Sequence, residues 1–226
     1  MENLRLPVLP IPNIVLYART SLPIYILEPV YIEMIKNCIK ENTPLAVSKA
    51  CEVNRSGVKG RFTPSDICGY GRPIILEENV DGTLKVLIKA IGRVRLLNVE
   101  QNLPYLIYEA ETFNDRIESE QLHGPQIQNL KKLLDNWLEV NILDSFERET
   151  FIKSLTSIYH VIDYICMFLV QDPELRQLLL ENNSLFERVQ LLNSLFERPS
   201  QFEESSLVVS AIKSYEEIEK TSRVAH

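Results

Sequence analysis

Short apolar runs broken by prolines occupy the beginning of the chain. The runs lie at residues 4–9, 13–17 and 22–27. Four prolines interrupt or border them, namely Pro7, Pro10, Pro12 and Pro23. Because proline cannot donate a hydrogen bond to a sheet ladder, these runs favour edge strands, bends and barrel corners over a flat central sheet.

One helix is expected inside this β-rich region. Pro29 is suited to the first helical turn, and the apolar residues after it recur on one helix face: Tyr31, Ile35, Cys38 and Ile39. The sequence Pro44-Leu-Ala-Val then indicates a returning strand. The pattern therefore predicts strands, one helix and a further strand in this order.

The clearest hairpin signal is Asp81-Gly82. Apolar runs at residues 74–76 and 84–88 flank it, and the favoured hairpin turn needs positive φ at both central positions. Further strands are expected at residues 93–99 and 105–112. Several short strands with one embedded helix are typical of a small, strongly bent, barrel-like sheet.

The second half of the chain changes to a helical period. One apolar stripe consists of Ile127, Leu130, Leu134, Trp137 and Leu138. Three further helix starts follow. Asp144 with Glu147 opens a helix expected to run to about residue 170, Asp172-Pro173-Glu174 opens the next, and a capping box of Ser184 and Glu187 opens the last. Four such helices predict a compact bundle, with a polar segment after Pro199.

Composition adds that this is an ordinary globular chain. It has 226 residues, of which 45% are apolar and 24% charged, and a formal net charge of −7. Residues 1–115 contain 13 basic and 13 acidic side chains, whereas residues 116–226 contain 11 and 18. The negative excess thus belongs to the helical half, which argues against nucleic acid as the main partner.

Neither metal binding nor membrane insertion is indicated. The four cysteines, Cys38, Cys51, Cys68 and Cys166, lack zinc-site spacing, and the three histidines are scattered. The N-terminus does not resemble a signal peptide. The most apolar stretch, residues 155–170, is shorter than the ~20 residues that a membrane span needs. We therefore expect a cytoplasmic protein without metal or cofactor.

The chain also lacks recognisable catalytic motifs. No glycine precedes a lysine, so the phosphate-binding loop of nucleotide hydrolases is absent, and Gly69-Tyr-Gly71 lacks the third glycine of a dinucleotide fingerprint. Cys51 and Cys68 border a basic loop, and His160 lies three residues before Asp163 on one helix. Ordinary thiols and a structural hydrogen-bonded pair explain these two arrangements better than catalysis does. No catalytic residue is predicted.

Four basic residues around the expected hairpin form an alternative site. Residues 49–95 contain nine basic and five acidic side chains. The RNA-facing candidates among them are Lys85, Lys89, Arg93 and Arg95. Arg93 and Arg95 project to the same side of a strand. A charged outer face of a half-buried sheet is the competing interpretation, because few aromatic residues are interleaved for base stacking.

Two segments carry a resemblance to a known family. Residues 6–17 contain Leu-Pro-Val-Leu-Pro-Ile-Pro, and residues 81–96 contain Asp-Gly-Thr-Leu-Lys-Val-Leu-Ile-Lys-Ala-Ile-Gly-Arg-Val-Arg-Leu. Together with Asp172–Glu181 and the capped helix after it, they resemble the N-terminal domain of the Lon ATP-dependent proteases, over about residues 4–198. The resemblance implies an α+β fold: a PUA-like bent β-barrel subdomain (1–118), an α-helical bundle subdomain (119–198) and a polar tail with one short helix (199–226).

The resemblance also implies a function. In Lon proteases this region helps to capture unfolded or tagged polypeptides and supports assembly. One departure is Leu27-Glu28-Pro29-Val30, where many family members have a charged run. The ATPase and Ser-Lys peptidase modules are absent from the sequence, so we expect a free-standing, non-catalytic recognition module. Its expected partners are unfolded or tagged polypeptides, or a full-length Lon protease.

Four residues are the predicted peptide contacts, because proline-broken edges and aromatic side chains suit strand addition. They are Tyr17, Pro23, Tyr25 and Tyr70. Core or rim packing is the competing interpretation for each of them. The alternative function is a PUA-like RNA-binding module, and an unrecognised small enzyme ranks last.

Overall fold

The computed structural model describes residues 3–52, 62–116, 118 and 124–196. The chain divides into two compact units, which we describe separately. The first comprises the residues up to Asn114 together with Asp172–Glu181, and the second comprises Asp115–Gln171 together with the residues from Asn182 onward. The tail predicted at residues 199–226 and the basic loop between Cys51 and Cys68 lie mainly outside the described residues.

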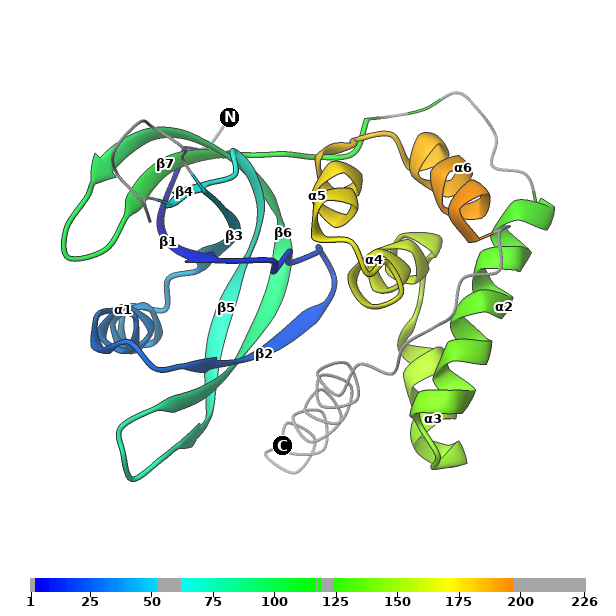
Figure 1. Cartoon of the computed structure of the whole chain (residues 1–226), viewed down its shortest axis with the longest axis horizontal. Coiled ribbons are helices and arrows are strands. Elements are labelled where there is room, and N and C mark those ends of the chain that lie inside the picture. The colour runs from blue at the N-terminus through cyan, green and yellow to red at the C-terminus, as the bar shows by residue number, and fades with distance from the viewer. Residues whose placement is uncertain (1–2, 53–61, 117, 119–123, 197–226) are drawn as a thin grey trace. The chain divides into compact units, whose positions relative to one another are not determined.

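The first unit contains one sheet and two helices in its described part (Figure 1). The strands are β1 (Leu4–Ile11), β2 (Ser21–Ile26), β3 (Leu45–Glu52), β4 (Phe62–Pro64), β5 (Ile67–Glu78), β6 (Leu84–Gln101) and β7 (Ile107–Thr112). The helices are α1 (Pro29–Lys40) and α5 (Pro173–Glu181). The run at residues 13–17 is not a strand, although its apolar pattern predicted one; most of its side chains are buried without joining a ladder.

Five of the strands close into a barrel. The hydrogen-bonded order is β1-β7-β6-β5-β3, and β1 also pairs in parallel with β3, so the last strand returns to the first. Closure satisfies backbone groups that an open sheet would leave at its edges. The predicted α+β fold with a bent barrel is therefore confirmed.

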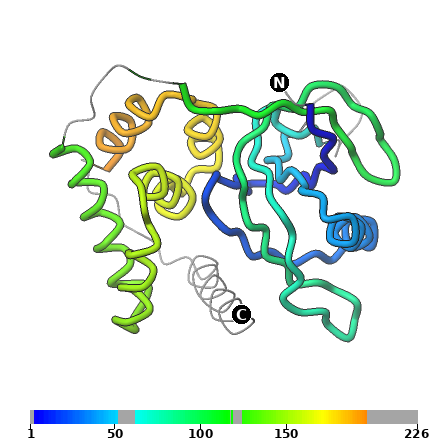
Figure 2. The backbone as a smooth tube through the Cα atoms, turned by 180° about the vertical axis from the view of Figure 1, so that it is seen from behind, coloured from blue at the N-terminus to red at the C-terminus, as the bar shows by residue number. Residues whose placement is uncertain are grey.

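The long β5–β6 hairpin extends beyond this barrel (Figure 2). Its turn is the predicted Asp81-Gly82 pair, where Gly82 has φ of 84°. The Asp81 carboxylate accepts hydrogen bonds from the Thr83 N–H at 3.0 Å and from the Thr83 hydroxyl at 2.7 Å. These bonds lower the pKa of the Asp81 side chain. On the far side of β6, β2 pairs antiparallel with residues 84–89.

Two hydrophobic clusters hold the first unit together. The barrel interior takes side chains from all five closing strands: Leu6, Val8, Ala46, Cys68, Val94, Leu96 and Ala110. The second cluster lies under α1, where Met34, Ile35 and Cys38 pack against Ile24 of β2 and Val86 of β6. Both β1 and β3 contribute to the two clusters: Leu6, Val8 and Ala46 belong to the first, and Leu9, Leu45 and Val47 belong to the second.

The helix α5 packs on the sheet, although its neighbours in sequence are helices of the second unit. The Glu174 N–H donates to the Asp172 carboxylate at 2.8 Å, which confirms the predicted cap. Arg93 donates to the Leu180 carbonyl at 2.6 Å. Lys49, buried within the unit, forms an ion pair with Glu174 at 2.6 Å. The apolar periodicity of a helix does not predict such hydrogen bonds and ion pairs.

The second unit consists of helices in its described part. They are α2 (Gly124–Asn141), α3 (Ser145–Ser154), α4 (Ile158–Phe168) and α6 (Leu185–Phe196). The predicted α2 stripe is confirmed by the burial of Leu130, Leu134 and Leu138.

One continuous helix from Asp144 to about residue 170 was the wrong expectation, because the chain breaks between α3 and α4. Leu155 has ψ of 76° and Ser157 is extended, with φ of −146° and ψ of 162°. The break lets α4 be buried on nearly all sides, while α3 keeps only Phe151 buried.

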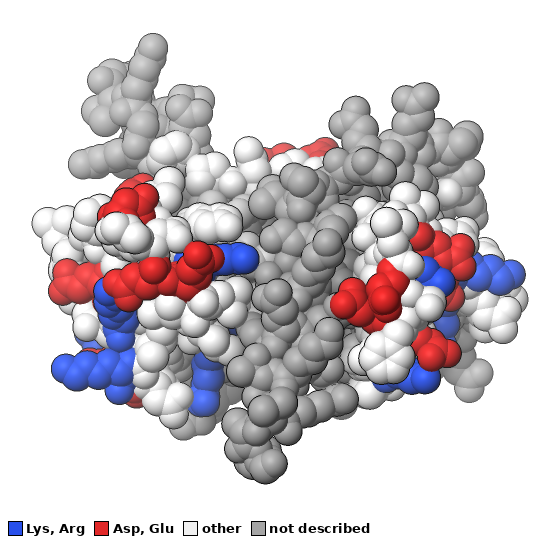
Figure 3. All heavy atoms as spheres, turned by 90° about the horizontal axis from the view of Figure 1, so that it is seen from below, with Lys and Arg blue, Asp and Glu red and all other residues white. Residues whose placement is uncertain are grey.

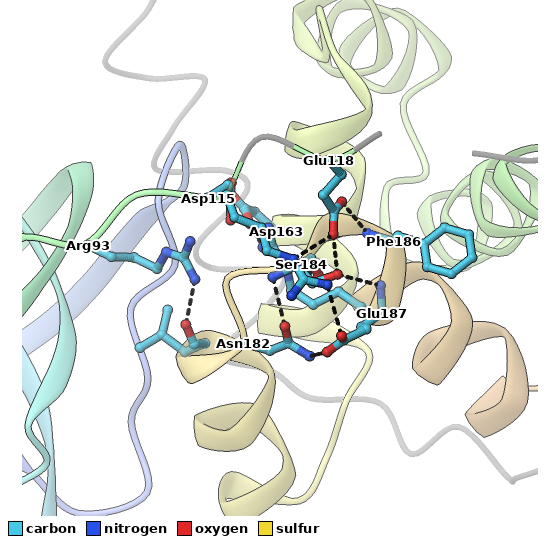
Figure 4. A network of polar contacts seen from close by, with 11 residues as sticks. Arg93, Asp115, Glu118, Asp163, Asn182, Ser184, Phe186 and Glu187 are labelled. Carbon is cyan, nitrogen blue, oxygen red and sulfur yellow. Dashed lines mark hydrogen bonds and ion pairs between the residues drawn. The ribbon is translucent and has the colours of Figure 1, made fainter. Parts of the chain in front are cut away.

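A buried ionic cluster holds the centre of the second unit (Figure 4). The side chain of Arg188 is 1% exposed, and its guanidinium binds the carboxylates of Asp115 and Asp163, the latter at 3.5 Å. Asp163 thus has a structural partner in Arg188, whereas His160 Nδ1 lies 2.8 Å from Ser157 Oγ. A buried charge requires such partners.

Glu118 and Ser184 cap α6 beside this cluster. Ser184 Oγ accepts the Glu187 N–H at 3.0 Å, as a capping box requires. The Glu187 carboxylate does not complete the box, since it binds Arg116 and Asn182, and the Ser184 N–H donates to Asn182 instead. Glu118 accepts the Ser184 hydroxyl and the Phe186 N–H, the latter at 2.9 Å. A capping carboxylate from a distant part of the sequence thus replaces the local one.

Candidate polypeptide-binding groove

The predicted peptide contact Tyr17 is an internal residue. Its side chain is 1% exposed, and its hydroxyl donates to the Arg176 carbonyl of α5 at 2.5 Å. Arg176 in turn donates to the Asn13 carbonyl at 3.2 Å. Tyr17 therefore joins α5 to the barrel, and we leave it out of the candidate surface.

Pro23 and Tyr25 lie on β2 at alternate positions, so they share one face of the strand. The opposite face carries Ile24 and Ile26, which are buried under α1. Tyr25 is 61% exposed. The two predicted residues are thus presented together on the outer side of the sheet.

The backbone of β2 also has a free side among the described strands, because its only partner there is β6. The Ala90 N–H donates to the Thr20 carbonyl at 2.9 Å, which makes the even-numbered residues of β2 the ones that bond β6. Pro23 and Tyr25 therefore direct their backbone groups to the other edge. The missing N–H of Pro23 falls on this edge, a common protection against uncontrolled strand addition.

Tyr70 does not share the surface of Pro23 and Tyr25. It lies on β5, half-buried against the barrel-interior cluster. A Cβ added at Gly92 would approach the Tyr70 ring within 3.1 Å, so the ring covers that glycine. Its contacts are those of a packing residue at the barrel wall.

The four basic candidates do not form one row. Lys85 lies opposite Glu77 of β5 and Tyr25 of β2. Arg95 pairs with Glu111 at 3.3 Å, and Arg93 is buried, where it donates to the Leu180 carbonyl. Both guanidinium groups lie 5.1 Å from the Phe113 ring centroid, which confirms that Arg93 and Arg95 share a face. The face in Figure 3 likewise shows acidic and basic side chains interspersed among the described residues.

A groove of about 350 Å³ lies between the end of α1 and the β5–β6 hairpin. Aliphatic side chains line it, with two cationic ones and the polar turn after α1. The lining residues are Cys38, Ile39, Asn42, Thr43, Arg72, Pro73, Ile74, Lys89, Ala90 and Ile91. Only Lys89 was singled out from the sequence. The other contacts come from three separate segments, so no local pattern brings them together.

A β-bulge shapes the end of this groove. Tyr70 pairs with Gly92 and Gly71 pairs with Ala90, which leaves Ile91 as the extra residue on β6. Ile91 is 47% exposed. A Cβ at position 71 would lie 2.3 Å from the Lys89 carbonyl oxygen, so the close approach of the strands requires Gly71.

Arg72 and Lys89 are direct cross-strand partners. Neither has an ion-pair partner among the residues that the structure describes. Nearby lysines are compensated: Lys36 pairs with Glu78 at 2.7 Å, and Lys85 lies opposite Glu77. Like charges placed directly opposite each other destabilise a sheet. The pair is therefore the electrostatic exception on this hairpin.

The thiols of Cys38 and Cys68 are both buried. Cys38 lies at the floor of the groove, and burial raises the pKa of its thiol. Burial also raises the pKa of Cys68 inside the barrel, which keeps that thiol protonated and unreactive. In the described part of the chain, no three metal-ligating side chains gather.

The fold defines an α+β domain with a closed barrel and a separate helical unit. The sequence matches the family model of the ATP-dependent protease La (LON) substrate-binding domain over residues 5–198, and the chain therefore belongs to this family. Lon protease 2 of Myxococcus xanthus is 24% identical over 222 residues, which are 96% of this chain and 26% of the relative. The chain thus spans about a quarter of the length of the curated relatives it matches.

Two solved structures have the same fold. The N-terminal domain of the Mycobacterium avium complex Lon protease superposes with a TM-score of 0.63 at 17% identity, covering 87% of this chain and 100% of that one. The Lon N-terminal domain protein from Xanthomonas campestris gives 0.58 at 16% identity, covering 84% and 98%. The family match concerns the substrate-binding domain alone. Among the described helices, none has the length and apolar character required to cross a bilayer.

Proposed function

We propose that this chain is a non-catalytic polypeptide-recognition module that binds exposed apolar segments of other proteins. The observation that carries the proposal is the groove between α1 and β5, with its aliphatic walls. Ile39, Ile74 and Ile91 are 41%, 36% and 47% exposed and all line it. Membership of the Lon substrate-binding family supports proteins as the ligand class. The partners that we propose are unfolded or tagged polypeptides and a Lon protease.

The groove follows a strand edge, which favours an extended ligand. The pairing of β3 with β5 ends at Gly71, and beyond it β5 pairs only with β6 among the described strands. Pro73 lies in this edge segment and lacks an N–H, so it offers an added strand its carbonyl alone. An added segment gains backbone hydrogen bonds at such an edge, while side-chain pockets select its residues.

The test is binding of a reduced, carboxymethylated globular protein, which stays unfolded, measured by fluorescence anisotropy. The double variant Ile39→Ser/Ile91→Ser removes two exposed aliphatic walls of the groove. We expect its affinity to fall about tenfold or more, since two large apolar contacts are lost. Urea unfolding of the variant checks that the fold is retained.

Leu103→Ser is the matched control, because Leu103 is a single exposed apolar side chain, at 82%, outside the groove. Its affinity should equal that of the wild type. Equal affinity of the groove variant and the wild type would contradict the proposal for this groove. Failure of the wild type to bind any unfolded protein would contradict the function itself.

Tyr25→Ala tests whether the outer face of β2 contributes to the same ligand. Tyr25 is exposed and belongs to neither hydrophobic cluster of the first unit, so the variant should fold with normal stability. We expect a loss of affinity of about threefold, smaller than in the groove variant. An unchanged affinity would restrict the binding surface to the groove.

A further inference from the structure

We propose that the groove prefers polypeptide segments in which an acidic side chain lies two residues from an apolar one. This inference rests on the proposed function, because it names the substrate class of the same groove. Its basis is the cross-strand pair of Arg72 and Lys89 at the groove wall. An acidic side chain of the ligand would supply the carboxylate that the described residues do not provide.

The positive charge of this pair is set by the fold. Arg72 and Lys89 are register partners on adjacent strands, and the bulge at Ile91 with Gly71 fixes that register. Their mutual repulsion raises the free energy of the empty groove. A carboxylate bound between the two cations relieves the repulsion and accepts charge-assisted hydrogen bonds. The free energy of binding is therefore more favourable for an anionic ligand.

The apolar walls select the neighbouring residue of the ligand. Ile74 follows Arg72 by two positions on β5 and faces the same side of the strand. Alternate residues of an extended chain are separated by about 6.6–6.8 Å. A segment paired along β5 repeats this spacing, so a carboxylate near Arg72 places an apolar side chain near Ile74. The ligand pattern is therefore acidic–x–apolar.

The end of α1 opposes this preference only weakly. The C-terminus of a helix has a partial charge of about −0.5. Lys40 lies in the last turn of α1 and Glu41 is its C-cap residue, so their opposite full charges offset each other and leave this partial charge. Two full cations on the hairpin outweigh it. Since both cations border solvent, their attraction should decrease as the salt concentration rises.

The experiment compares three labelled twelve-residue peptides with the same leucine and valine content. Their variable positions are Asp/Glu, Ser/Gln or Lys, each two residues from an apolar one. Affinities are measured at low and at moderate salt. For the wild-type protein we expect the acidic peptide to bind about five- to tenfold more tightly than the neutral one at low salt, and the Lys peptide most weakly.

The double variant Arg72→Gln/Lys89→Gln should bind the acidic and neutral peptides equally, because it retains the aliphatic walls without the charges. Lys85→Gln is the control: it removes one positive charge from β6, the strand of Lys89, at a position opposite Glu77. This control should keep the full preference. Comparing the two variants distinguishes the effect of the Arg72–Lys89 pair from the effect of a positive charge elsewhere on the hairpin.

The outcomes distinguish the inference from the function on which it rests. Equal wild-type affinity for acidic and neutral peptides would overturn the inference and leave the proposed function intact. Loss of the preference in Lys85→Gln would overturn it as well. If no peptide binds, both fail. Full displacement of the acidic peptide by inorganic phosphate or a short RNA, with no loss in Ile74→Ser, would indicate a simple anion site and overturn the apolar part.

Discussion

The two units surround an arginine side chain in opposite ways. In the second unit, called the helical unit below, Arg188 is buried and bound by the carboxylates of Asp115 and Asp163. In the first unit, which contains the barrel, Arg72 lies opposite Lys89 and has no carboxylate partner among the described residues. The first arrangement satisfies its charges internally. Under the proposal above, a ligand compensates the charges of the second.

This difference separates residues that stabilise the fold from residues that we propose to bind a ligand. A buried ion pair is strongly unfavourable to break, because the remaining charge has no solvent. An exposed like-charge pair destabilises the sheet only modestly, and we propose that it is open to a ligand. Substitutions in the two places should therefore act on different measurements, the first on stability and the second on affinity.

The largest expected effect is that of Arg188→Ala on stability. Removing the guanidinium leaves Asp115 and Asp163 facing each other inside the helical unit. We expect the free energy of unfolding to fall by about 3–5 kcal/mol, measured by urea denaturation. Lys153→Gln breaks an exposed i,i+4 pair with Glu149 and should change it by less than about 0.5 kcal/mol. Similar values for the two variants would contradict the structural role of Arg188.

Gly71→Ala should lower both stability and affinity. It therefore tests whether one residue of the first unit contributes to both. The added Cβ would meet the Lys89 carbonyl at 2.3 Å, which forces the strands apart at the bulge. We expect a loss of about 1–3 kcal/mol in stability and weaker peptide binding. Gly124→Ala is the control, since nothing lies within 4 Å of its Cβ position. Unaltered binding by Gly71→Ala would show that the bulge does not shape the site.

Tyr17→Phe should act on stability alone. The variant removes the hydroxyl that donates to the Arg176 carbonyl and keeps the buried ring. We expect a loss of about 1 kcal/mol, measured by urea denaturation, and unchanged affinity for unfolded protein. A reduced affinity without loss of stability would return Tyr17 to the binding surface.

Glu118→Gln should have the smallest effect on stability, and this effect should be present near neutral pH and disappear in acid. Burial raises the pKa of the Glu118 side chain, but hydrogen bonds from Ser184 and Phe186 outweigh it and lower the pKa below the ordinary value of 4.5. A lowered folded pKa gives stability that is present above pH 4.5 and is lost as the pH falls through the folded pKa.

The wild type should therefore lose more stability between pH 6 and pH 3 than the variant does, in urea titrations at both pH values. Asp81, whose pKa is also lowered, titrates in both proteins and cancels in the comparison. Parallel pH profiles for the two proteins would contradict this role of Glu118.

Local chemistry along the chain was sufficient for much of the fold. The Asp81-Gly82 hairpin, the helix from Pro29 and the caps at Asp144, Asp172 and Ser184 each depend on residues within a few positions of one another. The shared outer face of half-buried Pro23 and exposed Tyr25 was also predictable, because alternation along one strand assigns its faces. The sequence also identified the four basic residues of the alternative RNA-binding site, but it did not predict their interaction partners.

Only the tertiary structure decided which of these residues are available to a ligand. Tyr17 and Arg93 are internal because α5, about 80 residues or more away in sequence, supplies their carbonyl partners. Arg72 became a candidate because strand register places it opposite Lys89, and a bulge set by one glycine fixes that register. Sequence patterns report which face a side chain takes on its own element. Its partner depends on long-range packing, which no local spacing encodes.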